Sequence, residues 1–329
     1  MTANRLPGHS RHLAPHGYCG LAIMLLAEAL LLAGNRTVGV WFTPIMWTAY
    51  ILFVDALVHR LKGASLLVDN RAEFLIIALV SIASWWLFEL YNSPRFWESD
   101  LELWWHYHNL LPNPYLRRFG YDWAFATIFP ALFETAELFE ETLFSRTSGP
   151  PIRISRRASY AMIVLGAAAA IIPLAVISDW LVPAVWLSYA FLLDPINALM
   201  GLPSITGDLS RGRCRRLVSL LASGALCGVL WEFWNYWAIS KWTYTVPYLG
   251  NVKLFEMPVL GFLGFPPFAV ECWAIYIFCR GFLGPKDDIR NRWQAVSAEE
   301  YYPIWPQVQA VARTSVCAAP GEQAPGDEL

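Results

Sequence analysis

Three matched pairs of carboxylic acids lie within apolar stretches of this 329-residue chain, where a charged side chain is costly. They are Asp55, Glu89, Glu134, Asp194, Glu232 and Glu271. An acid in such surroundings usually has a polar partner or a chemical task. A buried carboxyl that keeps its proton can pass it to a bound molecule, so the four glutamates are candidate catalytic acids. We expect the two aspartates to be polar residues within the membrane.

Two of the glutamates have an asparagine three residues later, as Glu89 with Asn92 and Glu232 with Asn235. Residues three apart share a helix face, so each amide can orient its carboxyl. We therefore count both asparagines among the candidate substrate-binding residues.

The other two glutamates follow a proline by four residues, Glu134 after Pro130 and Glu271 after Pro267. A proline within a helix removes a backbone hydrogen bond and kinks the helix. The spacing predicts kinked spans that shape a cavity beside these two acids.

Aromatic residues gather near the acids, and the chain contains 17 Trp. An aromatic wall beside a carboxylic acid suits a polyene, a quinone or another isoprenoid, and it can stabilise a cation. The candidate substrate-binding aromatics are Trp86, Trp105, Tyr107, Trp231, Trp234, Trp242 and Tyr244. Two structural explanations stay open, because buried acids can join helices and tryptophans can form a belt at the membrane interface.

The stretches that carry these residues predict an all-α, polytopic membrane protein with about eight transmembrane helices. Of the 24 Lys and Arg, 18 fall on the side of the two termini and 6 on the other. This bias predicts that both termini are in the cytoplasm. We expect the protein to lie in the cell inner (plasma) membrane. The expected spans are 18–34, 38–58, 73–92, 121–139, 159–177, 181–200, 216–238 and 257–280.

The spans fall into two copies of one four-helix unit. A shift of 139 residues superimposes Asp55 on Asp194, and a shift of 143 superimposes Glu89 on Glu232. A shift of 137 superimposes the pair Trp105 and Tyr107 on Trp242 and Tyr244, and Glu134 on Glu271. Because each unit has an even number of spans, we expect the two units to be parallel, with any single active centre near the axis between them.

The predicted parts are a cytoplasmic N-terminus (1–17), the first repeat (18–145), a basic cytoplasmic linker (146–158), the second repeat (159–284) and a largely disordered cytoplasmic tail (285–329).

Several common chemistries are absent from the sequence. It has no aspartate-rich prenyl-diphosphate motif and no glycine-rich nucleotide loop. The pair His106 and His108 has Thr243 and Thr245 at the equivalent places, and the six Cys show no metal-type spacing. We therefore expect no cofactor, no metal and no nucleic acid as a partner.

The pattern W-x-Y followed by P-x-x-x-E, at Trp105, Tyr107, Pro130 and Glu134 and again at Trp242, Tyr244, Pro267 and Glu271, resembles the membrane lycopene cyclase domain. It resembles the transmembrane terpene cyclases more loosely. The resemblance covers about a third of the chain, and the double glutamate of that family is missing. It implies acid-initiated cyclisation, or related proton chemistry, of a carotenoid-like or terpene-like substrate.

Three functions remain open on the sequence alone. The first is a membrane enzyme for a lipophilic isoprenoid, with the glutamates as proton donors or acceptors. The second is a proton-coupled transporter of a small or lipophilic solute, because parallel repeats and intramembrane acids suit that task as well. The third is a non-catalytic, lipid-binding membrane subunit. In all three the partners are membrane lipids and a lipophilic small molecule, and the oligomeric state is open.

Overall fold

Long apolar helices make up most of the computed structural model, which describes residues 12–92, 104–176, 178–246 and 249–284. Seven of the described helical segments are long and apolar enough to cross a membrane. They are α1 (Pro15–Leu32), α3 (Phe42–Lys62), α5 (Arg71–Asn92), α8 (Arg156–Ala175), α9 (Val182–Leu199), α11 (Arg215–Trp237) and the segment Val259–Arg280. These helices indicate a membrane protein. The predicted tail 285–329 lies outside the described residues.

The remaining elements are short, and little of the chain is sheet. The short helices are α2 (Arg36–Val40), α4 (Leu66–Asp69), α6 (Pro114–Ala126), α7 (Ile128–Glu141), α10 (Ile205–Ser210) and the 3₁₀ turn η1 (Asp179–Leu181). The strands are β1 (Trp105–His108), β2 (Lys241–Tyr244), β3 (Lys253–Leu254) and β4 (Met257–Pro258). The segment Val259–Arg280 divides into the 3₁₀ helix η2 (Val259–Gly264) and α12 (Phe265–Arg280).

The expected span 121–139 differs from the others, because it is broken into the end of α6 and most of α7. At the break, the backbone N–H and the hydroxyl of Thr127 both donate to the carbonyl of Ala124, in place of a helical bond. Pro130 then lies in the first turn of α7, where its missing N–H costs nothing. Pro267 lies at the same place in α12. These prolines therefore do not kink a continuous helix: each lies in the first turn after its expected span is interrupted, at α6–α7 and at η2–α12.

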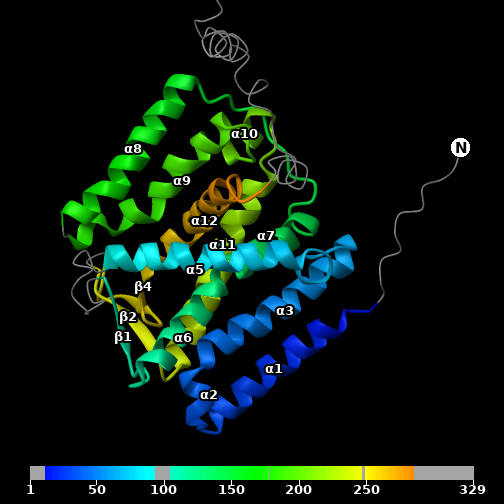
Figure 1. The fold of residues 1–329 in the computed structure, drawn as a ribbon, viewed down its shortest axis with the longest axis vertical. Coiled ribbons are helices and arrows are strands. Elements are labelled where there is room, and N and C mark those ends of the chain that lie inside the picture. Colours follow the sequence, from blue (N-terminus) through cyan, green and yellow to red (C-terminus); the bar gives the residue numbers. More distant parts are fainter. Residues whose placement is uncertain (1–11, 93–103, 177, 247–248, 285–329) are drawn as a thin grey trace, which may run out of the picture.

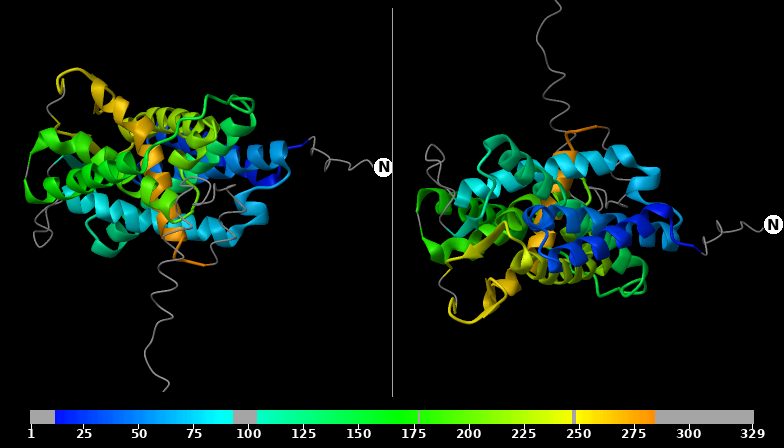
Figure 2. Two further views of the ribbon diagram at one scale, coloured as in Figure 1. Left: turned by 90° about the horizontal axis from the view of Figure 1, so that it is seen from above. Right: turned by 90° about the horizontal axis from the view of Figure 1, so that it is seen from below.

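The helices α7 and α12 occupy the middle of the bundle. Residues 128–137 of α7 and 271–277 of α12 are buried without interruption. The helix α7 packs against α3, α5 and α11, and α12 packs against α9, α11 and α5. Both views of Figure 2 show α12, in orange, passing through the centre of the molecule. The two helices that carry Glu134 and Glu271 are thus enclosed by the others.

Two helix pairs flank this centre, α1 with α3 and α8 with α9, as Figure 1 shows. Small residues make both contacts close: a Cβ on Gly20 would lie 2.4 Å from the Ala49 carbonyl oxygen, and one on Gly166 would lie 2.4 Å from the Leu192 nitrogen. Close backbone approach at small residues is typical of helix contacts within membranes. The outer faces of α1 and α8 carry exposed large apolar side chains, which lipid would cover.

Candidate functional site

Two strands from opposite halves of the chain pair at one end of the bundle, and we call this pair the ribbon. Strand β1 runs antiparallel to β2, with Trp105 opposite Tyr244 and Tyr107 opposite Trp242. Each W-x-Y pair therefore faces the other in reverse order. Side chains alternate across a strand, so these four rings share one face and His106 and His108 lie on the other. There the two histidines hydrogen-bond to Thr245 and Thr243, at 3.0 and 2.8 Å.

The two asparagines fasten the ribbon to the helices. Asn92, which is fully buried, accepts hydrogen bonds from the backbone nitrogens of Trp104 (2.7 Å) and Trp105 (3.1 Å) and donates to the Trp105 carbonyl (3.0 Å). Asn235 makes the corresponding pair of bonds to the backbone N–H and C=O of Trp242. The amides that the sequence placed among the substrate-binding residues thus hold the polypeptide that presents the aromatic rings.

Behind the ribbon, Glu89 and Glu232 each accept a hydrogen bond from a ribbon tyrosine. Tyr107 donates to Glu89 at 2.5 Å, and Tyr244 donates to Glu232 at 2.9 Å. The same oxygen of Glu89 also accepts the indole N–H groups of Trp85 and Trp105. Burial, reinforced by the adjacent carboxylate, raises the pKa of both tyrosine hydroxyls well above the ordinary value. Both tyrosines are therefore proton-bearing donors at neutral pH.

A cavity of about 310 Å³ lies against the ribbon, lined almost entirely by apolar and aromatic side chains. We call it the large cavity. Its walls come from both halves of the chain: Trp85, Trp104, Trp105, Val182, Pro183, Trp186, Leu187, Trp231, Tyr244, Val246, Met257, Leu260, Gly261, Leu263, Gly264, Phe265, Pro267 and Phe268. Three of these residues are also at the surface, since Leu187, Leu260 and Leu263 are 36, 42 and 70% exposed. They mark an apolar mouth between α9 and η2.

A second cavity of about 70 Å³, the small cavity, lies on the other side of a wall of aromatic rings. The residues that line both cavities are Trp85, Trp105, Trp186, Trp231 and Tyr244. Of these two cavities, Tyr107 and Trp242 line the small one alone. The larger space lies beside η2, where Gly261 and Gly264 leave room, whereas Tyr121 and Phe125 of α6 narrow the smaller one.

The predicted site residues thus separate into groups. Five predicted aromatics line at least one cavity: Trp105, Tyr107, Trp231, Trp242 and Tyr244. Trp86 and Trp234 line neither. The indole of Trp86 donates to Asp122 at 2.7 Å, with the Arg118 guanidinium 4.0 Å from its ring. The ring of Trp234 packs edge-on against Trp47, with the ring centroids 4.9 Å apart. Trp85 and Trp186 line both cavities although neither was a predicted site residue. The available signals were the place of Trp85 four residues before Glu89 and the match of Trp186 to Trp47 at a shift of 139 residues.

The second pair of glutamates lies away from the cavity walls. Glu134 is fully buried on α7. Glu271, on α12, accepts a hydrogen bond from the backbone nitrogen of Tyr189 at 2.8 Å and a long one from the Ser188 hydroxyl at 3.4 Å. None of the four glutamates lines the large or the small cavity, but Glu89 and Glu232 accept hydrogen bonds from side chains that do. The structure therefore brings Glu89 and Glu232, rather than all four acids, to the aromatic site.

The two aspartates hold short helices in place. Asp194 accepts the backbone N–H groups of Ile205 and Thr206 at the start of α10, at 2.6 and 2.9 Å. Asp55 accepts the Leu67 N–H at the start of α4, the Ser65 hydroxyl and a bond with His16, each at 2.9 Å. These contacts satisfy N–H groups that a helix leaves unpaired at its first turn. Both aspartates thus act as structural caps.

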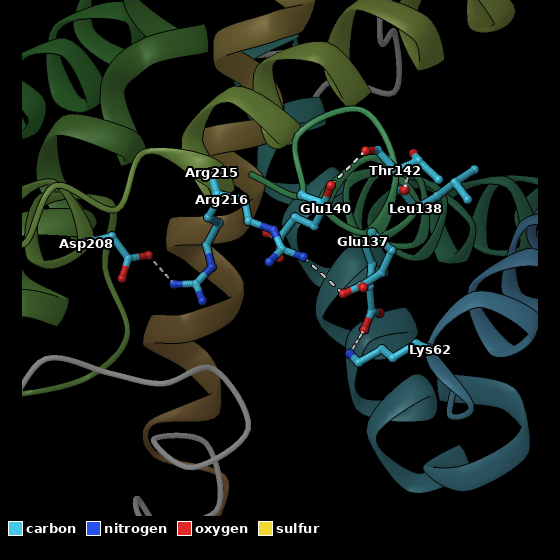
Figure 3. A network of polar contacts seen from close by, with 10 residues as sticks. Lys62, Glu137, Leu138, Glu140, Thr142, Asp208, Arg215 and Arg216 are labelled. Atoms are coloured by element: carbon cyan, nitrogen blue, oxygen red, sulfur yellow. Dashed lines mark hydrogen bonds and ion pairs between the residues drawn. The ribbon is translucent and has the colours of Figure 1, made fainter. Parts of the chain in front are cut away.

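The opposite end of α3, α7 and α11 from the ribbon carries charged side chains, shown in Figure 3. Lys62 pairs with Glu137, and Arg215 lies 3.1 Å from Glu141. Arg216 pairs with Asp208. Each of these charges has a partner of opposite sign, so this end joins helices and offers no second cluster of free acids among the residues that the structure describes.

No group of three or more possible metal ligands occurs among the described residues. Comparison of the chain with models of protein families, with curated protein sequences and with solved structures finds no match. The candidate site therefore stands on its own geometry.

Proposed function

We propose that this protein is an integral membrane enzyme that acts on a lipophilic isoprenoid, held in the large cavity, by proton transfer through Tyr244 and Glu232. One observation carries the proposal: Tyr244 lines the cavity, and its hydroxyl bonds to a buried carboxyl. The second carboxyl oxygen of Glu232 is buried and accepts no hydrogen bond from the described residues. For a transfer to Tyr244, the acid form would carry its proton on the other oxygen, the one in contact with the Tyr244 hydroxyl.

The proton transfer needs no other reactant. Glu232 in its acid form gives its proton to the Tyr244 oxygen while Tyr244 gives its own proton to a double bond of the ligand. The ligand becomes a carbocation and Glu232 a carboxylate. Attack by a second double bond forms a ring, and loss of a proton from a neighbouring carbon returns the pair to its first state. The net reaction is an isomerisation, in which nothing is oxidised or reduced.

The walls of the large cavity suit such an intermediate. Trp85, Trp105, Trp186 and Trp231 present ring faces, and aromatic rings attract cations more strongly when water is excluded. Two of the four indole N–H groups are bonded to Glu89 behind the wall. The site would therefore favour a positive charge without offering a nucleophile to quench it.

The size of the large cavity limits the ligand. A cavity of about 150 Å³ holds one benzene molecule, so about 310 Å³ has room for roughly twelve to fifteen carbons. A whole carotenoid is too long for this space, although one end of it fits. The apolar mouth at Leu187, Leu260 and Leu263 would admit such a molecule from the membrane.

A proton-coupled transporter is less well supported by the hydrogen bonds of the intramembrane acids. A proton path across the membrane would need acids at several depths, and Asp55 and Asp194 are occupied by backbone N–H groups. A lipid-binding subunit would need the cavity but not the tyrosine–glutamate pairs.

The finer architecture is part of the proposal. We propose two parallel four-helix repeats, with α7 counted as the fourth span of the first and both termini in the cytoplasm. The matching bonds of Asp55 with Asp194 and of Asn92 with Asn235 support the repeat, as does the reversed pairing of Trp105 with Tyr244. A distant kinship with the membrane lycopene cyclase domain belongs to the same proposal.

The test begins with the substrate. Lipids from cells with and without the gene are compared by mass spectrometry, and the isoprenoid that disappears is supplied to the purified protein in nanodiscs. General acid catalysis is worth about 10²–10⁴-fold, so Tyr244→Phe should lower turnover by about that factor. The matched control is Tyr236→Phe, because Tyr236 is 41% exposed and lines neither cavity. Identical isoprenoid profiles, or full activity of Tyr244→Phe, would refute the proposal.

A further inference from the structure

Trp85 stands between the large and the small cavity. Its ring packs against Phe268, which lines only the large cavity, with the centroids 6.1 Å apart. On the other side it packs against Phe125, which lines only the small cavity, at 5.7 Å. The ring is therefore part of the aromatic wall between the two cavities, and it contacts a lining residue of each.

The indole is held firmly in this place. Its N–H donates to Glu89 at 3.0 Å, only 8% of the residue is exposed, and Trp231 lies against it at 5.3 Å. A side chain with a buried hydrogen bond and packed rings on several sides has one available rotamer. The partition is thus a fixed wall of the binding site.

The position that the sequence repeat makes equivalent to Trp85 is Gly228, 143 residues later. A Cβ on Gly228 would lie 2.3 Å from the Phe265 ring, so Phe265 occupies the corresponding place in the second half. A tryptophan at this position is therefore a feature of the first half alone, and it is one of the five aromatic side chains that separate the large cavity from the small one.

We infer that Trp85 determines the length of the ligand, by ending the large cavity at roughly twelve to fifteen carbons. This inference rests on the proposed function. Of the other shared wall residues, Trp105 and Tyr244 suit the test less well, because both belong to the ribbon and Tyr244 bonds to Glu232. Removing the Trp85 ring leaves that pair in place and joins two spaces into a longer one.

The experiment measures binding of three radiolabelled prenyl alcohols, geraniol, farnesol and geranylgeraniol, to the full-length protein in nanodiscs, with empty nanodiscs subtracted. They contain ten, fifteen and twenty carbons. The variants are Trp85→Ala, which removes the partition, and Trp85→Phe, which keeps a ring but loses the N–H. Trp86→Ala is the matched control, since its neighbouring ring lines neither cavity.

The wild type should prefer farnesol to geranylgeraniol. Because each additional buried methylene favours binding, Trp85→Ala should bind geranylgeraniol at least about tenfold more tightly than the wild type does. Trp85→Phe and Trp86→Ala should keep the wild-type order. If Trp85→Ala binds the alcohols but keeps the wild-type preference, the inference is wrong and the proposed function stands. If the wild type binds none of the three, the proposed function fails first.

Discussion

Replacing Asn92 by alanine should loosen the ribbon by an amount that the contacts allow us to calculate. The change leaves three buried backbone groups without their partner, the nitrogens of Trp104 and Trp105 and the Trp105 carbonyl. At about 1 kcal/mol net for each hydrogen bond, the free energy of unfolding should fall by about 3 kcal/mol. The same change at Asn235 removes two bonds to Trp242, and we expect about 2 kcal/mol.

Asn197 supplies the matched control for this series. It is equally buried, lies on α9 away from the ribbon, and donates one hydrogen bond, to the carbonyl of Ala274. Alanine there should cost about 1 kcal/mol. The assay is reversible denaturant unfolding in mixed micelles, together with hydrogen exchange of the β1 and β2 amides. Only the Asn92 and Asn235 variants should accelerate exchange in the ribbon.

Two outcomes would refute this reasoning. The first is a cost at Asn92 no greater than at Asn197. The second is unchanged exchange in the ribbon together with weaker ligand binding, which would return both asparagines to a direct role in holding a substrate.

Two further predictions concern packing and pH. Gly166→Ala should destabilise the protein by about 1–3 kcal/mol, because the new Cβ would lie 2.4 Å from the backbone of α9. This cost should outweigh the better helix propensity of alanine. A more stable variant in the same unfolding assay would contradict the close contact. The raised pKa of Tyr107 and Tyr244 means that the folded state holds these protons more tightly than the unfolded state, so their contribution to stability is present below about pH 10 and is lost as the pH rises further. The double variant Tyr107→Phe with Tyr244→Phe should lack this part of the slope of unfolding free energy between pH 9 and 11, and an unchanged slope would exclude the two hydroxyls as its source.

The helices were largely predictable from the sequence, because a span needs about twenty apolar residues and that signal is local. The described segments 15–32, 71–92 and 215–237 agree with the expected spans within three residues. The break within the expected span 121–139 could not be predicted in this way. The apolar composition of this span continues across Thr127, and only the local hydrogen bonding to Ala124 shows that the helix divides there.

The candidate site was predictable in its residue types and less so in its geometry. The pairs of Glu89 with Tyr107 and of Glu232 with Tyr244 unite residues that the spacing had singled out. The antiparallel pairing of β1 with β2 joins segments more than a hundred residues apart, and short strands of this kind carry almost no periodic signal. For the same reason the sequence could not reveal that Asn92 serves the backbone of the ribbon, or that the ribbon tyrosines bond to Glu89 and Glu232 and not to Glu134 or Glu271.

The central claim is that the large cavity binds an apolar, isoprenoid-sized molecule, and equilibrium binding of radiolabelled farnesol tests it most directly. Val182 is buried and lines only the large cavity, so Val182→Phe would fill that space and leave the ribbon untouched. We predict saturable binding of one farnesol per wild-type protein in nanodiscs, and a loss of at least about tenfold in affinity for Val182→Phe. Binding no greater than to empty nanodiscs, or equal affinity in the filled variant, would contradict the account.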